Sequence, residues 1–130
     1  MIEYRTYSGS INAYQDGERI GGVITYTRPS VMIMSELPKA VVWVFNLCIE
    51  VPFRKNGYAR RLMQRVIAVH GHQQLELSAS PSDDHTDVIP FAKLVSFYQS
   101  LGFVADRITS WCNPPKPIAY MYRPATTMFN

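Results

Sequence analysis

The sequence predicts an α/β domain with a central sheet of mixed strand direction. Three observations support this: β-type segments dominate both ends of the chain, two segments with helical periodicity lie in its second half, and the elements follow the order β-β-β-α-β-α-β-β. The 130 residues suit one domain, spanning 1–130. A content of 47% hydrophobic and 18% charged residues is enough to build an apolar core.

The first half of the chain supplies strands. Residues 11–15 and 20–26 are β-type segments on either side of Asp16-Gly17-Glu18, which predicts a hairpin with an Asp-Gly turn. Residues 39–49 are rich in β-branched and aromatic side chains, which favours a buried strand. A short strand fits residues 2–7, and residues 31–34 would extend the sheet or begin an edge strand.

The second half alternates between helices and strands. Residues 57–69 carry apolar side chains on one helical face and Arg and Gln on the other, and Gly71 is expected to cap this helix in a left-handed conformation. A second helix is predicted from Pro90 to Leu101, closed by Gly102. The remaining strands are expected at residues 75–79, 104–111 and 118–122.

A basic turn joins the buried strand to the first helix. It reads Arg54-Lys55-Asn56-Gly57-Tyr58-Ala59, and five of the fifteen residues from Val51 to Arg65 are Arg or Lys, with none acidic. A strand–turn–helix join presents free backbone N–H groups and the positive end of a helix to an anion. The turn therefore predicts a ligand that carries phosphate.

Two motifs in this setting resemble the GNAT superfamily, the acetyl-CoA-dependent N-acetyltransferases. Residues 54–59 match the cofactor motif [Arg/Gln]-x-x-Gly-x-[Gly/Ala] of that family. Residues 97–103, Phe-Tyr-Gln-Ser-Leu-Gly-Phe, are similar to its Tyr-x-x-Leu-Gly-Phe block. The order of strand, turn, helix, strand and second helix also agrees, over roughly residues 11–123.

The resemblance implies a mostly antiparallel central sheet with helices packed on its faces, and acetyl-CoA as the acyl donor. The pyrophosphate would bind the N–H groups at the helix start, and the pantetheine arm would pair with the preceding strand like an added β-strand. The residues implied in cofactor binding are Leu47, Cys48, Ile49, Arg54, Lys55, Asn56, Gly57, Tyr58, Ala59 and Arg60.

For catalysis the resemblance implies direct acetyl transfer to an amine. It assigns Tyr98 as the acid that protonates the leaving thiolate. An amine is mostly protonated near neutral pH, so a base is also needed. We expect Glu76 to serve, because it lies in the strand beside the cofactor strand. Glu50, or an acid of the loop Asp83-Asp84-His85-Thr86-Asp87, acting through water, is an open alternative.

The acceptor is expected to be an amine of a protein or a small molecule. Members of the family usually carry two helices between the first strand and the hairpin, and these form one wall of the acceptor site. Here the hairpin begins about Ile11, so the fold is expected to lack those two helices. We therefore expect the missing wall to come from a second subunit in a homodimer, or from the acceptor itself.

The sequence also leaves other functions open. The short N-terminal region favours a GNAT-like module that binds coenzyme A or a partner without catalysis. A net charge of +3, concentrated in one segment, makes a nucleic-acid partner unlikely. The two cysteines form no CxxC pair, His70 and His72 make a poor metal signal, and the apolar runs are short for a bilayer. A cytoplasmic protein without a metal or a membrane partner is expected.

Overall fold

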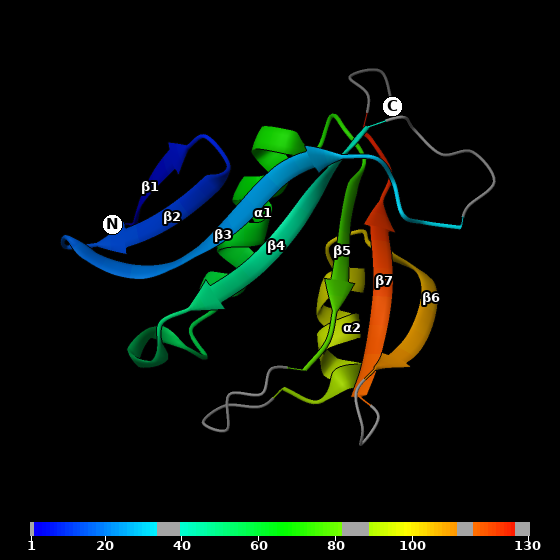
Figure 1. Cartoon of the computed structure of the whole chain (residues 1–130). Coiled ribbons are helices and arrows are strands. Elements are labelled where there is room, and N and C mark those ends of the chain that lie inside the picture. The colour runs from blue at the N-terminus through cyan, green and yellow to red at the C-terminus, as the bar shows by residue number, and fades with distance from the viewer. Residues whose placement is uncertain (1, 34–39, 82–88, 112–115, 127–130) are drawn as a thin grey trace.

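The computed structural model describes residues 2–33, 40–81, 89–111 and 116–126. Within them a sheet is covered by two α-helices (Figure 1). The strands are β1 (Ile2–Tyr7), β2 (Ser10–Gln15), β3 (Glu18–Arg28), β4 (Val41–Ile49), β5 (Leu75–Ala79), β6 (Val104–Trp111) and β7 (Lys116–Arg123). The helices are α1 (Tyr58–His70) and α2 (Phe91–Gln99), and a short 3-10 helix, η1 (Val51–Phe53), precedes α1.

The seven strands form one sheet in the order β1-β2-β3-β4-β5-β7-β6. The pairing of β4 with β5 is parallel, and the other five pairings are antiparallel. The crossover from β4 to β5 contains α1, as a parallel connection requires. The predicted mixed, mostly antiparallel sheet is therefore confirmed.

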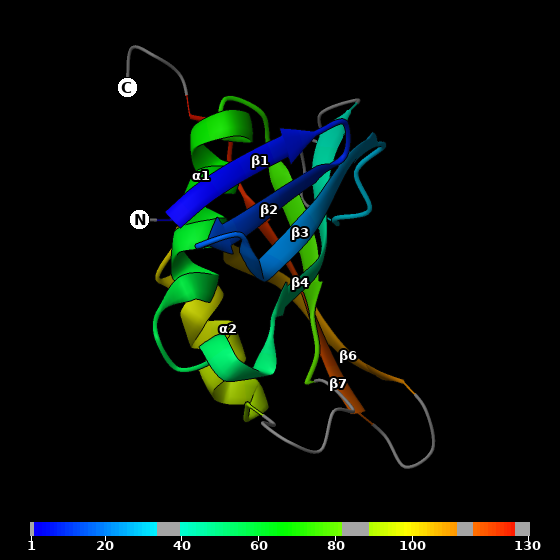
Figure 2. The same ribbon diagram turned by 90° about the vertical axis from the view of Figure 1, so that its left-hand side faces the viewer.

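Both helices lie on the same face of the sheet, as Figure 2 shows. Helix α1 packs against β2, β3 and β4, while α2 packs against β5 and β6. One core joins the two helices, because Leu62, Met63 and Val66 of α1 and Tyr98 of α2 belong to the same buried cluster. The two expected helices are therefore present, and both cover one face. The opposite face carries no helix among the described residues, and we call it the helix-free face.

The helix-free face is partly apolar. Ile24 of β3 and Phe45 of β4 are cross-strand partners on this face, and these residues are 38% and 53% exposed. Tyr26 is paired with Trp43 in the same way, and Tyr26 is 42% exposed. The sheet therefore presents aromatic and aliphatic surface next to the strands that build the site.

Two local predictions are wrong. Residues 31–33 form no strand; side chains of β5 and β6 hold this segment as an irregular connection. Gly71 ends α1 with a right-handed backbone, at φ −65°, because its N–H still bonds the Ile67 carbonyl within the helix. Gly102 does adopt the left-handed conformation, at φ 95°. Within the described chain, neither helix has the length and apolarity needed to cross a bilayer.

Candidate active site

The site begins where two neighbouring strands separate. β4 and β5 are paired at only two positions, Val42 with Leu75 and Trp43 with Glu76. Beyond Trp43 the edge of β4 that faces β5 has lost its neighbour, and Figure 1 shows the two strands diverging. Backbone N–H and C=O groups on such an edge are able to pair with an extended ligand.

A bulge in β4 marks the point of divergence. Gly22 of β3 is paired with Cys48 and Ile24 with Phe45, so Asn46 and Leu47 stand opposite a single residue, Val23. Asn46 has φ 57°, a left-handed conformation that Asn tolerates better than most residues. A bulge bends its strand and redirects backbone groups, and bulges are frequent beside active sites. In the sequence, the only signal of this bulge is that Asn46 is a polar residue within an apolar strand.

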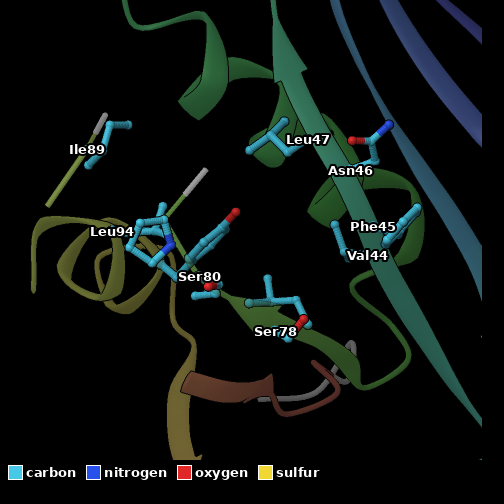
Figure 3. A pocket seen from close by; sticks show the side chains of 12 residues that line it. Val44, Phe45, Asn46, Leu47, Ser78, Ser80, Ile89 and Leu94 are labelled. Atoms are coloured by element: carbon cyan, nitrogen blue, oxygen red, sulfur yellow. The ribbon is translucent and has the colours of Figure 1, made fainter. Parts of the chain in front are cut away.

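The space between the strands is a pocket of about 300 Å³ (Figure 3). Its walls are β4, β5 with the two residues after it, and α2 with a residue just before its first turn. The lining residues are Val44, Phe45, Asn46, Leu47, Leu77, Ser78, Ala79, Ser80, Pro81, Ile89, Leu94 and Tyr98. Phe45 also lies on the helix-free face, so the pocket adjoins that face. Such a mostly apolar pocket with a few polar groups is typical of a small-ligand site.

Tyr98 is the ionisable side chain among the lining residues. It occupies the last turn of α2, and its ring packs edge to face against Phe97 and Phe103, with centroids 5.1 and 5.8 Å away. Only 9% of the residue is exposed, and burial raises the pKa of its phenol to about 12. Its hydroxyl forms no hydrogen bond with the rest of the described chain. Tyr98 is therefore a neutral acid, held rigidly, at physiological pH.

The raised pKa predicts an alkaline loss of stability. An unfolded chain releases the phenol proton near pH 10, whereas the folded protein holds it to about pH 12. Between these values the unfolded state binds fewer protons, so the free energy of unfolding falls as pH rises. We expect a loss of about 2–3 kcal/mol across this range that Tyr98→Phe does not show. Urea unfolding of both proteins at several alkaline pH values measures the difference; parallel curves would contradict the prediction.

The basic turn and the start of α1 form the second part of the site. Lys55 and Gly57 have positive φ angles of 66° and 80°, and α1 begins directly after Gly57. The first backbone bond into the helix runs from the Arg61 N–H to the Gly57 carbonyl. The N–H groups of residues 58–60 therefore have no acceptor within the helix, and the first turn contains no acidic residue. The turn can bind an anion through backbone N–H groups and the helix dipole.

Side chains of the turn attach it to the end of β4 and stabilise its own backbone. Arg54 donates from Nε to the Ile49 carbonyl at the end of β4, at 2.8 Å. The Asn56 side-chain amide donates to the carbonyls of Phe53 and Arg54, at 3.3 and 3.1 Å. These bonds fix the path of the backbone between β4 and α1, which keeps the N–H groups of the turn in place.

Two further residues tie the start of α1 to other elements. The Tyr58 hydroxyl donates to Gln15 Oε1 in β2, at 3.2 Å. Arg60 donates from Nη2 to Ser100 Oγ, at 2.8 Å, and lies over the Phe97 ring at the end of α2. Arg60 thus links the basic turn to the helix that carries Tyr98, a connection that the sequence did not reveal.

The three predicted residues of β4 occupy the bulge and the two positions after it. Leu47 lines the pocket, Ile49 packs at the margin of the core, and Cys48 is an exposed free thiol. Cys48 and Ile49 pair with Gly22 and Gly21 of β3, and no β5 residue pairs with this part of β4 on its other side. The structure therefore brings this edge and Tyr98 together around one pocket, with the basic turn at the end of the same strand.

Glu76, the expected base, is placed differently. It is fully buried, and it is absent from the lining of the pocket, whereas its neighbours Leu77 and Ser78 belong to it. Its carboxylate accepts hydrogen bonds from the Ser30 hydroxyl, the Val31 N–H and the Gln74 side-chain amide. The structure does not bring Glu76 and Tyr98 together, because Glu76 faces the connection after β3. Three hydrogen-bond donors satisfy this buried carboxylate, so its structural role is to anchor the segment that follows β3.

The connection that Glu76 holds has a second anchor. Asp106 of β6 accepts from the Ile33 N–H, at 2.9 Å, and Arg107 donates to the Val31 carbonyl, also at 2.9 Å. Asp106 and Arg107 also form an ion pair of 3.0 Å. Three charged side chains thus fix residues 30–33 on the helix-free face.

Glu76→Gln tests the anchoring role. The glutamine amide has only one oxygen, so its NH₂ group would face at least one of the three donors and that hydrogen bond would be lost. We therefore expect the free energy of unfolding to fall by about 1–3 kcal/mol. The acetyl transfer that the resemblance implies, and its pH profile, should change little per folded molecule. The opposite result would support Glu76 as the base: a fully folded variant that has lost both activity and the acidic limb of the pH profile.

The alternative bases are located less favourably or lie outside the described residues. Glu50 is partly exposed, pairs with Arg19 and is not part of the pocket lining. The acids of residues 83–87 fall in a segment that the structure does not describe.

Comparisons with known proteins agree with the fold. Residues 8–105 match the family described as the acetyltransferase (GNAT) domain. No curated protein has a sequence that matches this chain.

Solved structures show the same fold. The ribosomal-protein-S18-alanine N-acetyltransferase from Escherichia coli superposes with a TM-score of 0.66 at 18% identity, covering 95% of this chain and 70% of that one. NAA60 of Arabidopsis thaliana, in complex with acetyl-CoA, gives 0.63 at 17%, covering 87% and 74%. An aminoglycoside 6'-N-acetyltransferase complexed with coenzyme A gives 0.63 at 17%, covering 91% and 73%.

The family match includes both parts of the site, since β4, the basic turn, α1 and Tyr98 all fall within residues 8–105. It also covers most of the chain, and the likeness to solved structures shows the same fold. This protein belongs to the GNAT acetyltransferase family.

Proposed function

We infer that this protein transfers an acetyl group from acetyl-CoA to an amine. The observation that carries this function is the pocket between the diverging strands β4 and β5. Tyr98 lines that pocket, and an anion-binding turn follows the same β4 strand. Membership of the GNAT family, and similar folds that have been solved with coenzyme A or acetyl-CoA, support it.

The described residues fit coenzyme A. An added Cβ at Gly57 would meet nothing within 4 Å, so the turn is open to a ligand, and the N–H groups of residues 58–60 are available to a pyrophosphate. The side chains of Arg54, Lys55 and Arg60 add positive charge around this turn. Along Leu47, Cys48 and Ile49, the backbone groups that point away from β3 would hold the amide-rich pantetheine arm by hydrogen bonds.

The chemistry assigned to the pocket is direct acyl transfer. Acetyl-CoA supplies an acetyl thioester; a C–N bond forms to the neutral amine as the C–S bond breaks, which releases coenzyme A as a thiol. A backbone N–H near the Asn46–Leu47 bulge would stabilise negative charge on the carbonyl oxygen. Tyr98 would donate its proton to the leaving sulfur, and solvent at the pocket mouth would accept the proton that the amine loses.

The acceptor approaches from the side that is open. The pocket adjoins the helix-free face at Phe45, and residues 30–33 are fixed on that face. We propose that an amine on a protein or a small molecule enters there. That a second subunit or the acceptor itself completes the wall stays a prediction, as does a cytoplasmic location.

A steady-state assay of thiol release tests the function. The protein is incubated with acetyl-CoA and a panel of amines that includes peptides with free N-termini, lysine peptides and small polyamines, and thiol release is followed with a chromogenic disulfide. Amine-dependent release, with the acetylated product seen by mass spectrometry, is the expected result. Tight binding of acetyl-CoA without turnover on any amine would favour a coenzyme A-binding module instead.

A further inference from the structure

The outer strand β1 has properties that the proposed function does not use. It stands at one end of the sheet, and within the described residues only β2 pairs with it. Figure 2 shows β1 nearest the viewer with its outer edge uncovered. All six of its residues are paired with β2 without a bulge, so the strand is regular and so is its free edge. The strand at the other end, β6, has an irregular register between Ala105 and Arg107.

The side chains of β1 differ between its two faces. Ile2 and Tyr4 pack against the core on the helix side. Glu3 and Arg5 lie on the helix-free face, where they form an ion pair of 3.1 Å with side chains 63% and 42% exposed. Arg5 also lies over the Tyr14 ring of β2, at 4.1 Å, which holds its side chain beside the strand. The free edge thus presents one acidic and one basic side chain in fixed positions.

Strand geometry restricts how two copies of β1 could pair. Successive residues of a strand direct their N–H and C=O groups to alternate edges, so only residues of one parity in β1 face outward. In an antiparallel pair of identical strands around a two-fold axis, each residue must therefore stand opposite one of the same parity. A shift by a single residue is forbidden, which leaves few registers.

Charge selects among the allowed registers. With Tyr4 on the axis, Glu3 of each copy stands opposite Arg5 of the other copy. The two ion pairs, one in each strand, then form a group of four side chains in which positive and negative charges alternate. The neighbouring allowed registers place Glu3 opposite Glu3, or Arg5 opposite Arg5. Opposite charges directly across an antiparallel pair are stabilising and like charges are destabilising.

We propose that the free edge of β1 pairs with β1 of a second copy of this chain, antiparallel and with Tyr4 on the two-fold axis. The axis would run perpendicular to the continuous sheet, so all helices lie on one side and the interface is isologous. The contact is small, so the dimer is reversible rather than permanent. The pocket lies at β4 and β5, beyond β2 and β3, so the dimer leaves it open. This interface is independent of the proposed function.

Charge exchange tests both the interface and its register. Glu3→Arg and Arg5→Glu each replace the two opposite-charge pairs by like-charge pairs, which should weaken the dimer about 30-fold. The double variant restores the opposite charges in reverse order and should regain the original dissociation constant. Glu18→Arg makes the same change of charge on an exposed residue at the start of β3 and serves as the matched control.

Sedimentation velocity over a wide concentration series, at low and high salt, measures the equilibrium. Circular dichroism confirms that each variant is folded. We expect a concentration-dependent dimer that salt weakens, with reduced amide hydrogen exchange in β1 at high concentration. A strictly monomeric protein would overturn the proposal, and so would a dimer indifferent to Glu3→Arg. Failure of the folded double variant to recover dimerisation would overturn the register.

Discussion

Replacing Tyr98 by Phe is expected to slow acetyl transfer about 100-fold while acetyl-CoA binding stays nearly unchanged. The variant keeps the ring that packs against Phe97 and Phe103, so α2 and the pocket wall should be preserved. It removes only the hydroxyl that would protonate the leaving sulfur. The loss should therefore appear in kcat, with little change in KM for acetyl-CoA.

The pH dependence adds a second test of the same role. Because burial raises the pKa of Tyr98 to about 12, the acid stays protonated throughout the usual assay range. The wild-type rate should therefore rise with pH as the amine is deprotonated, with no decline from Tyr98 below about pH 11. As a matched control, Tyr122→Phe removes the hydroxyl of another tyrosine, on β7, and should leave kcat unaltered. Equal turnover of the Tyr98→Phe protein and the wild type would show that Tyr98 is not the acid.

Gly57→Glu is expected to abolish detectable binding of acetyl-CoA, with an affinity loss of at least about 100-fold. The new side chain would project into the open space in front of the helix start. Its carboxylate would occupy the position of the pyrophosphate and use the same N–H groups. Isothermal titration calorimetry with acetyl-CoA measures the effect.

Backbone strain must be separated from this loss of the anion site. Gly57 has φ 80°, where any side chain costs about 1–2 kcal/mol. Gly17 of the β2–β3 turn has the same φ and the same open surroundings. Gly17→Glu is therefore the control variant, because it introduces the same backbone strain and the same charge away from the basic turn. Gly57→Gln keeps the bulk without the charge and should bind with intermediate affinity. Unchanged affinity in the folded Gly57→Glu protein would place the site elsewhere.

The sequence determined the elements of this fold because its signals are local. The alternation in Leu75–Ala79 predicted β5 with its observed bounds, and the change to helical periodicity at Gly57 predicted α1 to within a residue. The basic turn was also evident, since the run of Arg and Lys and the change from strand to helical periodicity are properties of neighbouring residues. The basic turn, for which we propose binding of the pyrophosphate, could therefore be located before the structure.

The role of Glu76 needed the tertiary structure. Alternation along β5 shows that Glu76 faces away from Leu75 and Leu77, but it does not show which face holds the pocket. That depends on α1 and α2 both packing on the side of the leucines. Ser30 and Val31 are more than forty residues away in sequence, so their hydrogen bonds to Glu76 follow only from the path of the chain after β3.

Local patterns were therefore enough to predict the seven strands that form, both helices, the basic turn and the family motifs, all of which depend on short-range periodicity and backbone preference, although they also suggested a strand at residues 31–34 that is absent from residues 31–33. Tertiary structure decided that β4 and β5 separate after two paired positions, that a bulge at Asn46 accompanies the separation, and that Tyr98 closes the resulting pocket. These features arise from contacts between segments distant in sequence, whose free energies depend on how whole faces of the sheet and helices fit together.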